Sequence, residues 1–167
     1  MGETTKKYWL MKSEPDEFSI ADLKTKKRER WSGVRNYVAR NYMMRDMQIG
    51  DLVLFYHSNA KPSGVAGLAR ISALAIPDET AWDRKSGYFD AKSTPDKPRW
   101  YCVEVEYVDT FKKFTSLEEI KNTPKLKDMA LLRYSRLSVQ PVTTQEFQLI
   151  CKMSGLAKPP KEARPVT

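Results

Sequence analysis

Apolar and polar residues follow the pattern of β-strands through the middle of the chain. Residues 52–56 form a continuous apolar run, which is typical of a buried central strand. Residues 65–76 are rich in small apolar side chains that allow a long strand to bend. Residues 8–11 predict a shorter strand that ends before Pro15, and the alternation in residues 100–108 predicts a half-exposed antiparallel strand.

Helical spacing and capping residues predict helices on both sides of these strands. Ser19 is an N-cap residue with an acid three positions later, so a short helix is expected to begin there. Residues 34–47 carry further side chains at helical offsets. Capping boxes at residues 116–119 and 143–146 predict two more helices, the second ending near Gly155. This order predicts an α+β fold in which several helices pack on a small mixed β-barrel.

The length of 167 residues, 41% of them hydrophobic, predicts one domain with its own core. We expect this domain over residues 8–156, after an extension of residues 1–7 and before a basic, Pro-rich tail of residues 157–167. Cys102 and Cys151 lie far apart and without metal-ligand spacing, which predicts two reduced core cysteines and no metal site. No apolar run has the length of a membrane span, and no apolar leader opens the chain.

The chain carries a net charge of +8, which favours an anionic partner such as a phosphate backbone. Charge alone leaves an anionic membrane surface open as well. Together with the family resemblance given below, we expect nucleic acid and no membrane as the partner, bound by a monomer. The basic run of residues 24–30 contains Lys24, Lys26 and Arg28. It is open to three interpretations: phosphate contact, a patch that resembles a nuclear-import signal, or a solvated loop.

The motifs of common enzyme classes are missing from the sequence. It contains neither a GxSxG elbow nor a glycine-rich phosphate loop, so we predict no cofactor and no catalytic residue. His57, the single histidine, directly follows the apolar run of residues 52–56. A structural hydrogen bond, contact with a ligand and acid–base catalysis all remain open for it.

Three other segments combine side chains that suit a nucleotide. Trp31 and Gly33 precede a predicted helix, on which we expect two amides that read a base edge and two arginines that contact phosphate: Asn36, Asn41, Arg35 and Arg40. The alternative places Trp31 in the core and the arginines on a solvated face. Lys12, Ser13 and Glu14 end the first strand, where they form either a polar pocket or a turn. Residues 134–141 alternate like a strand beside a pocket, and Arg136 there suits a phosphate or a surface acid.

The same segments, in this order, carry a family resemblance. WLMKSEP at residues 9–15, WSGVRNYVARN at residues 31–41, FYHS at residues 55–58 and RLSVQP at residues 136–141 closely resemble the EVE domain pattern. The resemblance extends over nearly the whole chain. It implies a PUA-like barrel, related to YTH domains, that acts in the nucleus as a non-enzymatic reader of a modified base. Modified cytosine in DNA is the leading ligand, ahead of RNA.

The motif positions also give the expected site. They place at the base Lys12, Ser13, Glu14, Trp31, Gly33, Asn36, Asn41, Tyr56, His57, Arg136, Leu137 and Ser138. From their charge, we expect the phosphate contacts to come from Lys24, Lys26, Arg28, Arg35 and Arg40. The YTH comparison makes Trp31 one aromatic wall, while Phe55, Tyr56 and Trp100 compete for a second. Two other functions stay open: an RNA- or protein-binding module without selectivity for modification, and an enzyme acting through His57 or Lys12.

Overall fold

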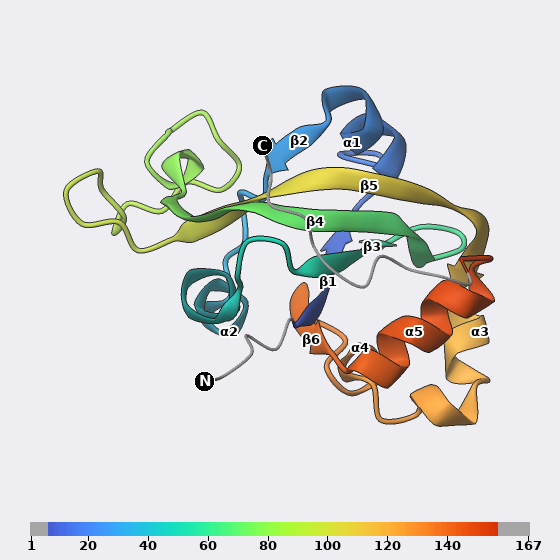
Figure 1. Ribbon diagram of the computed structural model, residues 1–167. Helices are drawn as coiled ribbons and strands as arrows, with labels where there is room; N and C mark the ends of the chain where they lie inside the picture. Colours follow the sequence, from blue (N-terminus) through green and yellow to red (C-terminus); the bar gives the residue numbers. More distant parts are fainter. Residues whose placement is uncertain (1–6, 157–167) are drawn as a thin grey trace, which may run out of the picture.

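The computed structural model describes residues 7–156, in which six strands form one sheet with helices packed around it (Figure 1). The strand order is β2-β5-β4-β3-β1-β6. Strands β1 and β3 are parallel, and the other neighbours are antiparallel. The strands are β1 (Tyr8–Ser13), β2 (Arg28–Arg30), β3 (Leu52–His57), β4 (Gly64–Pro77), β5 (Tyr101–Ser116) and β6 (Val139–Val142).

The helices are short, and they complete the predicted α+β class. The α-helices are α1 (Ile20–Lys26), α2 (Tyr37–Asn41), α3 (Leu117–Lys121), α4 (Ala130–Arg133) and α5 (Thr144–Met153). A π-helical turn, η1 (Tyr42–Asp46), continues α2, and 3-10 turns form η2 (Glu79–Ala81) and η3 (Pro124–Leu126). In Figure 1, α3, α4 and α5 gather at one end of the sheet, and the loop between β4 and β5 projects from the other end.

Strand alternation divides the core into two layers. Trp9 and Phe55 lie in a layer that α1, α2 and η1 cover, while Leu10 and Leu54 lie in a layer that Phe147 of α5 covers. Both layers exclude water from β1 and β3, since all four strand residues are at most 1% exposed. This two-sided burial explains why residues 52–56 form an unbroken apolar run instead of alternating.

The parallel pairing of β1 with β3 creates the setting for the site. Ser13 lies opposite His57, so both strands end at the same edge of the sheet. Beyond that edge the Ser58 N–H donates to the Ser13 carbonyl at 2.9 Å. The polar residues that follow each strand are therefore brought together by the sheet itself.

Two elements differ from the sequence prediction in their bounds. The helix expected over residues 34–47 begins at Tyr37, because Asn36 adopts an extended backbone and caps it. The strand expected over residues 100–108 continues to Ser116. The alternation that predicts a strand stops earlier, because register shifts in its pairing with β4 interrupt it. The helix predicted from the second capping box is confirmed, with both reciprocal bonds present at Thr143 and Glu146.

The two cysteines lie in the core, as predicted. Cys102 and Cys151 are free and buried, and burial is the main cause that raises the pKa of each thiol to about 12. Within residues 7–156, no helix combines the length and apolar character needed to cross a membrane. The described residues also contain no cluster of His, Cys, Asp or Glu arranged to hold a metal ion. The predicted tail and most of the predicted extension lie outside the described residues.

Candidate nucleic-acid pocket

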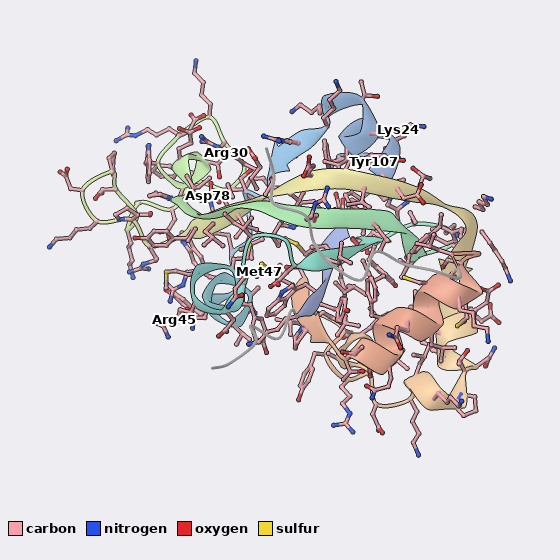
Figure 2. The ribbon with its side chains drawn as sticks, viewed as in Figure 1. Lys24, Arg30, Arg45, Met47, Asp78 and Tyr107 are labelled. Carbon is pink, nitrogen blue, oxygen red and sulfur yellow. The ribbon has the colours of Figure 1, made fainter. Side chains whose placement is uncertain are left out.

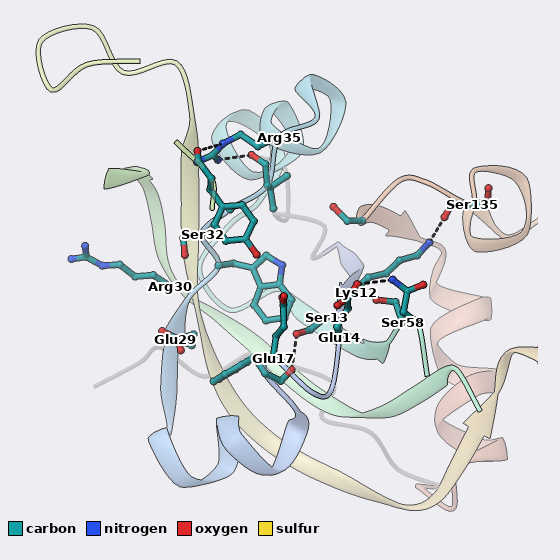
Figure 3. A pocket seen from close by; sticks show the side chains of 17 residues that line it. Lys12, Ser13, Glu14, Glu17, Glu29, Arg30, Ser32, Arg35, Ser58 and Ser135 are labelled. Atoms are coloured by element: carbon teal, nitrogen blue, oxygen red, sulfur yellow. Dashed lines mark hydrogen bonds between the residues drawn. The ribbon is translucent and has the colours of Figure 1, made fainter. Parts of the chain in front are cut away.

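A cavity of about 610 Å³ opens beside the ends of β1 and β3 (Figure 3). This volume is in the range of small-molecule and cofactor sites. Five segments of the chain contribute to it, so the fold and not one local motif builds the site. The lining consists of Lys12, Ser13, Glu14, Glu17, Phe18, Glu29, Arg30, Trp31, Ser32, Gly33, Val34, Arg35, Ser58, Asn59, Tyr88, Ser135 and Ser138.

The end of β1 supplies polar groups that neighbouring segments orient. Lys12 Nζ donates to the Ser135 carbonyl at 2.8 Å, and burial lowers the pKa of this ammonium group. Ser13 Oγ donates to a carbonyl of the turn before α1 at 2.6 Å. Glu14 accepts a hydrogen bond from the Asn59 side-chain amide. These groups are fixed in direction, and the Glu14 carboxylate keeps further acceptor capacity.

Trp31 is a core side chain that also forms part of the cavity wall. The residue is 7% exposed, and its ring packs edge-on against Phe55 with the ring centroids 5.5 Å apart. Its backbone N–H donates to the Val103 carbonyl at 2.8 Å. The two interpretations of Trp31 are therefore compatible, because a largely buried indole still borders the cavity.

A buried carboxylate holds the loop that follows Trp31. Asp78 is 1% exposed and accepts from Gly33 N at 2.8 Å, Arg35 Nη1 at 3.0 Å and Thr80 N at 3.0 Å. Burial raises the pKa of Asp78, but the hydrogen bonds and the charge of Arg35 outweigh it, so the net pKa is lowered. Gly33 is suited to this turn because its φ of +87° lies in the left-handed region.

Arg35 lies at the cavity but acts mainly as an internal clamp. Its Nε and Nη2 atoms donate to the Tyr88 carbonyl at 3.0 and 2.7 Å, in addition to the Asp78 pair. Only 22% of the side chain is exposed. The predicted phosphate contact for Arg35 is therefore not supported by its geometry, because acceptors within the protein already use its donors.

Six predicted base-binding residues border the cavity: Lys12, Ser13, Glu14, Trp31, Gly33 and Ser138. The other six lie elsewhere, for identifiable reasons. Asn36 Oδ1 caps α2, and Asn41 Oδ1 accepts from the Arg40 guanidinium. Tyr56 is 3% exposed in the layer under α5. His57 Nε2 accepts from the first N–H of α1 at 3.1 Å, and burial lowers the pKa of the ring, as suits a structural hydrogen bond.

The segment before β6 divides in the same way. Ser138 lines the cavity, whereas Leu137 packs against the core and Arg136 is exposed outside the lining. Residues 134–141 thus contribute two residues to the lining, Ser135 and Ser138. Arg136 and Leu137 therefore lie outside the cavity lining.

The predicted phosphate contacts lie on the surface around α1 and β2. Lys24 is exposed on α1 (Figure 2), Lys26 pairs with Glu29 at 2.8 Å, and Arg28 lies 3.7 Å from Glu106. These exposed pairs leave the charges accessible to solvent. Arg40 differs from them.

Arg40 belongs to a partly exposed stack of rings and cations. Its guanidinium donates to the Arg99 carbonyl at 2.9 Å and lies 4.7 Å from the centre of the Tyr37 ring. Tyr37 in turn stacks on Trp100 with the centroids 4.9 Å apart. Arg40 is therefore placed to stabilise α2, and its guanidinium already has partners within the protein.

None of the three candidates for a second aromatic wall lines the cavity. Phe55 is fully buried, Tyr56 faces the opposite layer, and Trp100 stacks on Tyr37. Phe18 and Tyr88 border the cavity instead. Phe18 follows the KSEP motif closely, but Tyr88 lies in a loop whose sequence has no helical or strand period.

The sequence of this domain matches the model of one protein family over nearly its whole length. The EVE domain model matches residues 7–153, and the chain belongs to that family. The resemblance predicted from the motifs is therefore confirmed.

Characterised relatives and solved structures support the same assignment. The chain is 40% identical to thymocyte nuclear protein 1 of mouse, over 91% of this chain and 75% of the mouse protein. It is 50% identical to a hypothetical protein of Leishmania major, whose structure matches with a TM-score of 0.87 over 90% of this chain and 95% of the other. A structure of human THYN1 protein in complex with 5-methylcytosine-containing DNA matches with a TM-score of 0.86 and 39% identity, over 93% of this chain and all of that one.

Proposed function

We propose that this chain binds nucleic acid and accepts a modified base, 5-methylcytosine in DNA as the first candidate, in the cavity beside β1 and β3. The observation that carries the proposal is the likeness of the whole domain to human THYN1, which was solved with 5-methylcytosine-containing DNA. The chain is proposed to act by binding alone. The likeness to thymocyte nuclear protein 1 supports a nuclear location for this chain.

The lining offers the chemical groups that a cytosine needs. The exocyclic amino group of cytosine is a donor, and carboxylates are its usual protein acceptors, so Glu14 is the proposed partner. The Lys12 ammonium group is a donor for the carbonyl oxygen of cytosine. Trp31 and Phe18 give the apolar, aromatic surface on which the base ring packs.

The base must leave its stack to enter this cavity. Extrusion from a duplex costs a few kcal/mol and costs least for single strands or weakened pairs. We therefore expect tighter binding to single strands than to matched duplexes. The phosphate term comes from exposed cations, with Lys24, Lys26 and Arg28 as the proposed contacts.

Selectivity for the modification is expected to be modest. Burial of one methyl group gains about 0.8 kcal/mol, close to a fourfold change in affinity. A hydroxymethyl group that forms a hydrogen bond gains about 1 kcal/mol, close to fivefold. A preference within about tenfold over plain cytosine follows from these terms.

Fluorescence polarisation tests the proposal with short single strands that differ only at one cytosine. The strands carry cytosine, 5-methylcytosine or 5-hydroxymethylcytosine, each measured at two salt concentrations. The proposal expects a modification preference that survives the higher salt, because salt weakens the phosphate contacts of all three strands alike, while the contacts to the methyl or hydroxymethyl group are uncharged. Equal affinities that fall together with salt would point to an unselective module, and turnover of the strand would point to an enzyme.

A further inference from the structure

Tyr88 is an aromatic side chain that the fold fixes in position yet leaves open to solvent. It lies in the loop of residues 82–100 between β4 and β5, where it borders the cavity with 41% of its surface exposed. Large rings contribute most to stability when they are buried. A ring that is held but exposed at a cavity is a surface prepared for contact with a ligand.

The backbone of Tyr88 is held through a chain of buried polar contacts. Nε and Nη2 of Arg35 donate to the Tyr88 carbonyl, and Nη1 of the same guanidinium pairs with buried Asp78. The guanidinium also lies 5.7 Å from the centre of the Tyr88 ring. Asp78 directly follows β4, so its contact with Arg35 fixes the position of the loop relative to the sheet.

The ring of Tyr88 rests on Gly33. A Cβ atom at position 33 would lie 2.8 Å from two atoms of the Tyr88 ring, closer than such contacts allow. The lack of a side chain there lets the ring approach the loop that carries Trp31. Both rings therefore border one cavity from loops that are distant in sequence.

We propose that Tyr88 is the second aromatic wall of the base-binding cavity, with Gly33 and Arg35 as the residues that position it. This inference rests on the proposed function and assigns the contact that limits the space around the modified base. Burial and the negative charges of Glu17 and Glu14 raise the pKa of the Tyr88 phenol. The hydroxyl therefore remains a neutral donor at physiological pH.

The test compares Tyr88→Phe, which keeps the ring, with Tyr88→Leu, which keeps apolar volume but no ring. Phe89→Ala is the matched control, because Phe89 is the next residue, is also 41% exposed and is not part of the lining. Each variant is titrated with a single strand that carries one 5-methylcytosine, labelled with carbon-13 in its methyl group. Affinity and the methyl NMR shift are read from the same samples.

Loss of one base–aromatic contact lowers affinity by about 5- to 150-fold, which is expected for Tyr88→Leu. The upfield methyl shift that ring currents produce is expected to shrink in that variant alone. Tyr88→Phe and Phe89→Ala should stay within about twofold of the wild type. A merely structural role for Tyr88 would change thermal stability but not the methyl shift of the bound state.

Two failures are distinguishable. A wild-type protein that binds cytosine and 5-methylcytosine equally, with no methyl shift on binding, would overturn the proposed function. A selective wild type with unchanged affinity and methyl shift in Tyr88→Leu would overturn the assignment of Tyr88 alone. Equal losses in Tyr88→Leu and Tyr88→Phe would also overturn it, because the ring would then not be the contact.

Discussion

The Asp78–Arg35 pair is the contact on which the geometry of the cavity depends most. Asp78→Ala removes the acceptor of Gly33, Arg35 and Thr80 N–H groups and leaves the guanidinium without its carboxylate. Breaking a buried ion pair lowers the free energy of unfolding by about 3–5 kcal/mol. Because 22% of the Arg35 side chain is exposed and water can solvate it in part, we expect a loss near the lower end, about 3 kcal/mol.

The chain offers a matched control with the same geometry and different burial. Arg133 and Asp128 also lie 3.0 Å apart, but their side chains are 58% and 67% exposed. Asp128→Ala should therefore change the free energy of unfolding by less than about 0.5 kcal/mol. Urea unfolding measures both, and the midpoint of thermal unfolding should fall by about 6–12 °C for Asp78→Ala.

The pH dependence gives the same pair a second signature. The folded pKa of Asp78 lies below its ordinary value of 3.8, so its contribution to stability is fully present above pH 3.8. It is lost as the pH falls through the folded pKa, and the wild type should then lose its advantage over Asp78→Ala. Equal destabilisation by Asp78→Ala and Asp128→Ala, or an advantage that persists in strong acid, would refute the reasoning.

Substitutions at Gly33, His57 and Trp31 give three further predictions. Gly33→Ala should lower the free energy of unfolding by about 1–2 kcal/mol and weaken binding, because φ is +87° and the new Cβ displaces Tyr88. Gly87→Ala, with no atom within 4 Å of its Cβ, is the control in calorimetry, and equal effects would contradict the account. For His57, burial lowers the folded pKa below 6.5, so the stability advantage of the wild type over His57→Gln should be present above pH 6.5 and decline below it in urea titrations. An advantage that grows on acidification would contradict this. Trp31→Ala should abolish any preference for a modified base and lower the free energy of unfolding by about 3–5 kcal/mol, whereas Trp31→Phe should keep the fold. If fluorescence polarisation showed that a folded Trp31→Ala protein still prefers the modified base, Trp31 would not be a wall of the base-binding cavity.

The sheet could be predicted where burial alone decides the pattern. Residues 52–56 are covered on both faces, so their continuous apolar run gave β3 nearly to the residue. The end of β5 could not be predicted in this way. Its register shifts against β4 place buried Phe111 directly before exposed Lys112 and Lys113, which breaks the alternation that identifies a strand.

The site could be predicted only in its local parts. Lys12, Ser13 and Glu14 were found because a strand end is visible in sequence. Asn36 was assigned to a base edge because the same amide chemistry serves a base and a helix N-cap, and only the backbone conformation separates the two. Tyr88 was missed because contacts across the fold, through Arg35 and Gly33, bring it to the cavity.

The most direct measurement is a crystal structure of this chain with a short DNA strand that carries one 5-methylcytosine. We expect the modified base inside the cavity beside β1 and β3, with its amino group at Glu14 and its ring against Trp31 and Tyr88. A strand bound elsewhere on the surface, or a modified base outside the cavity, would contradict the central claim.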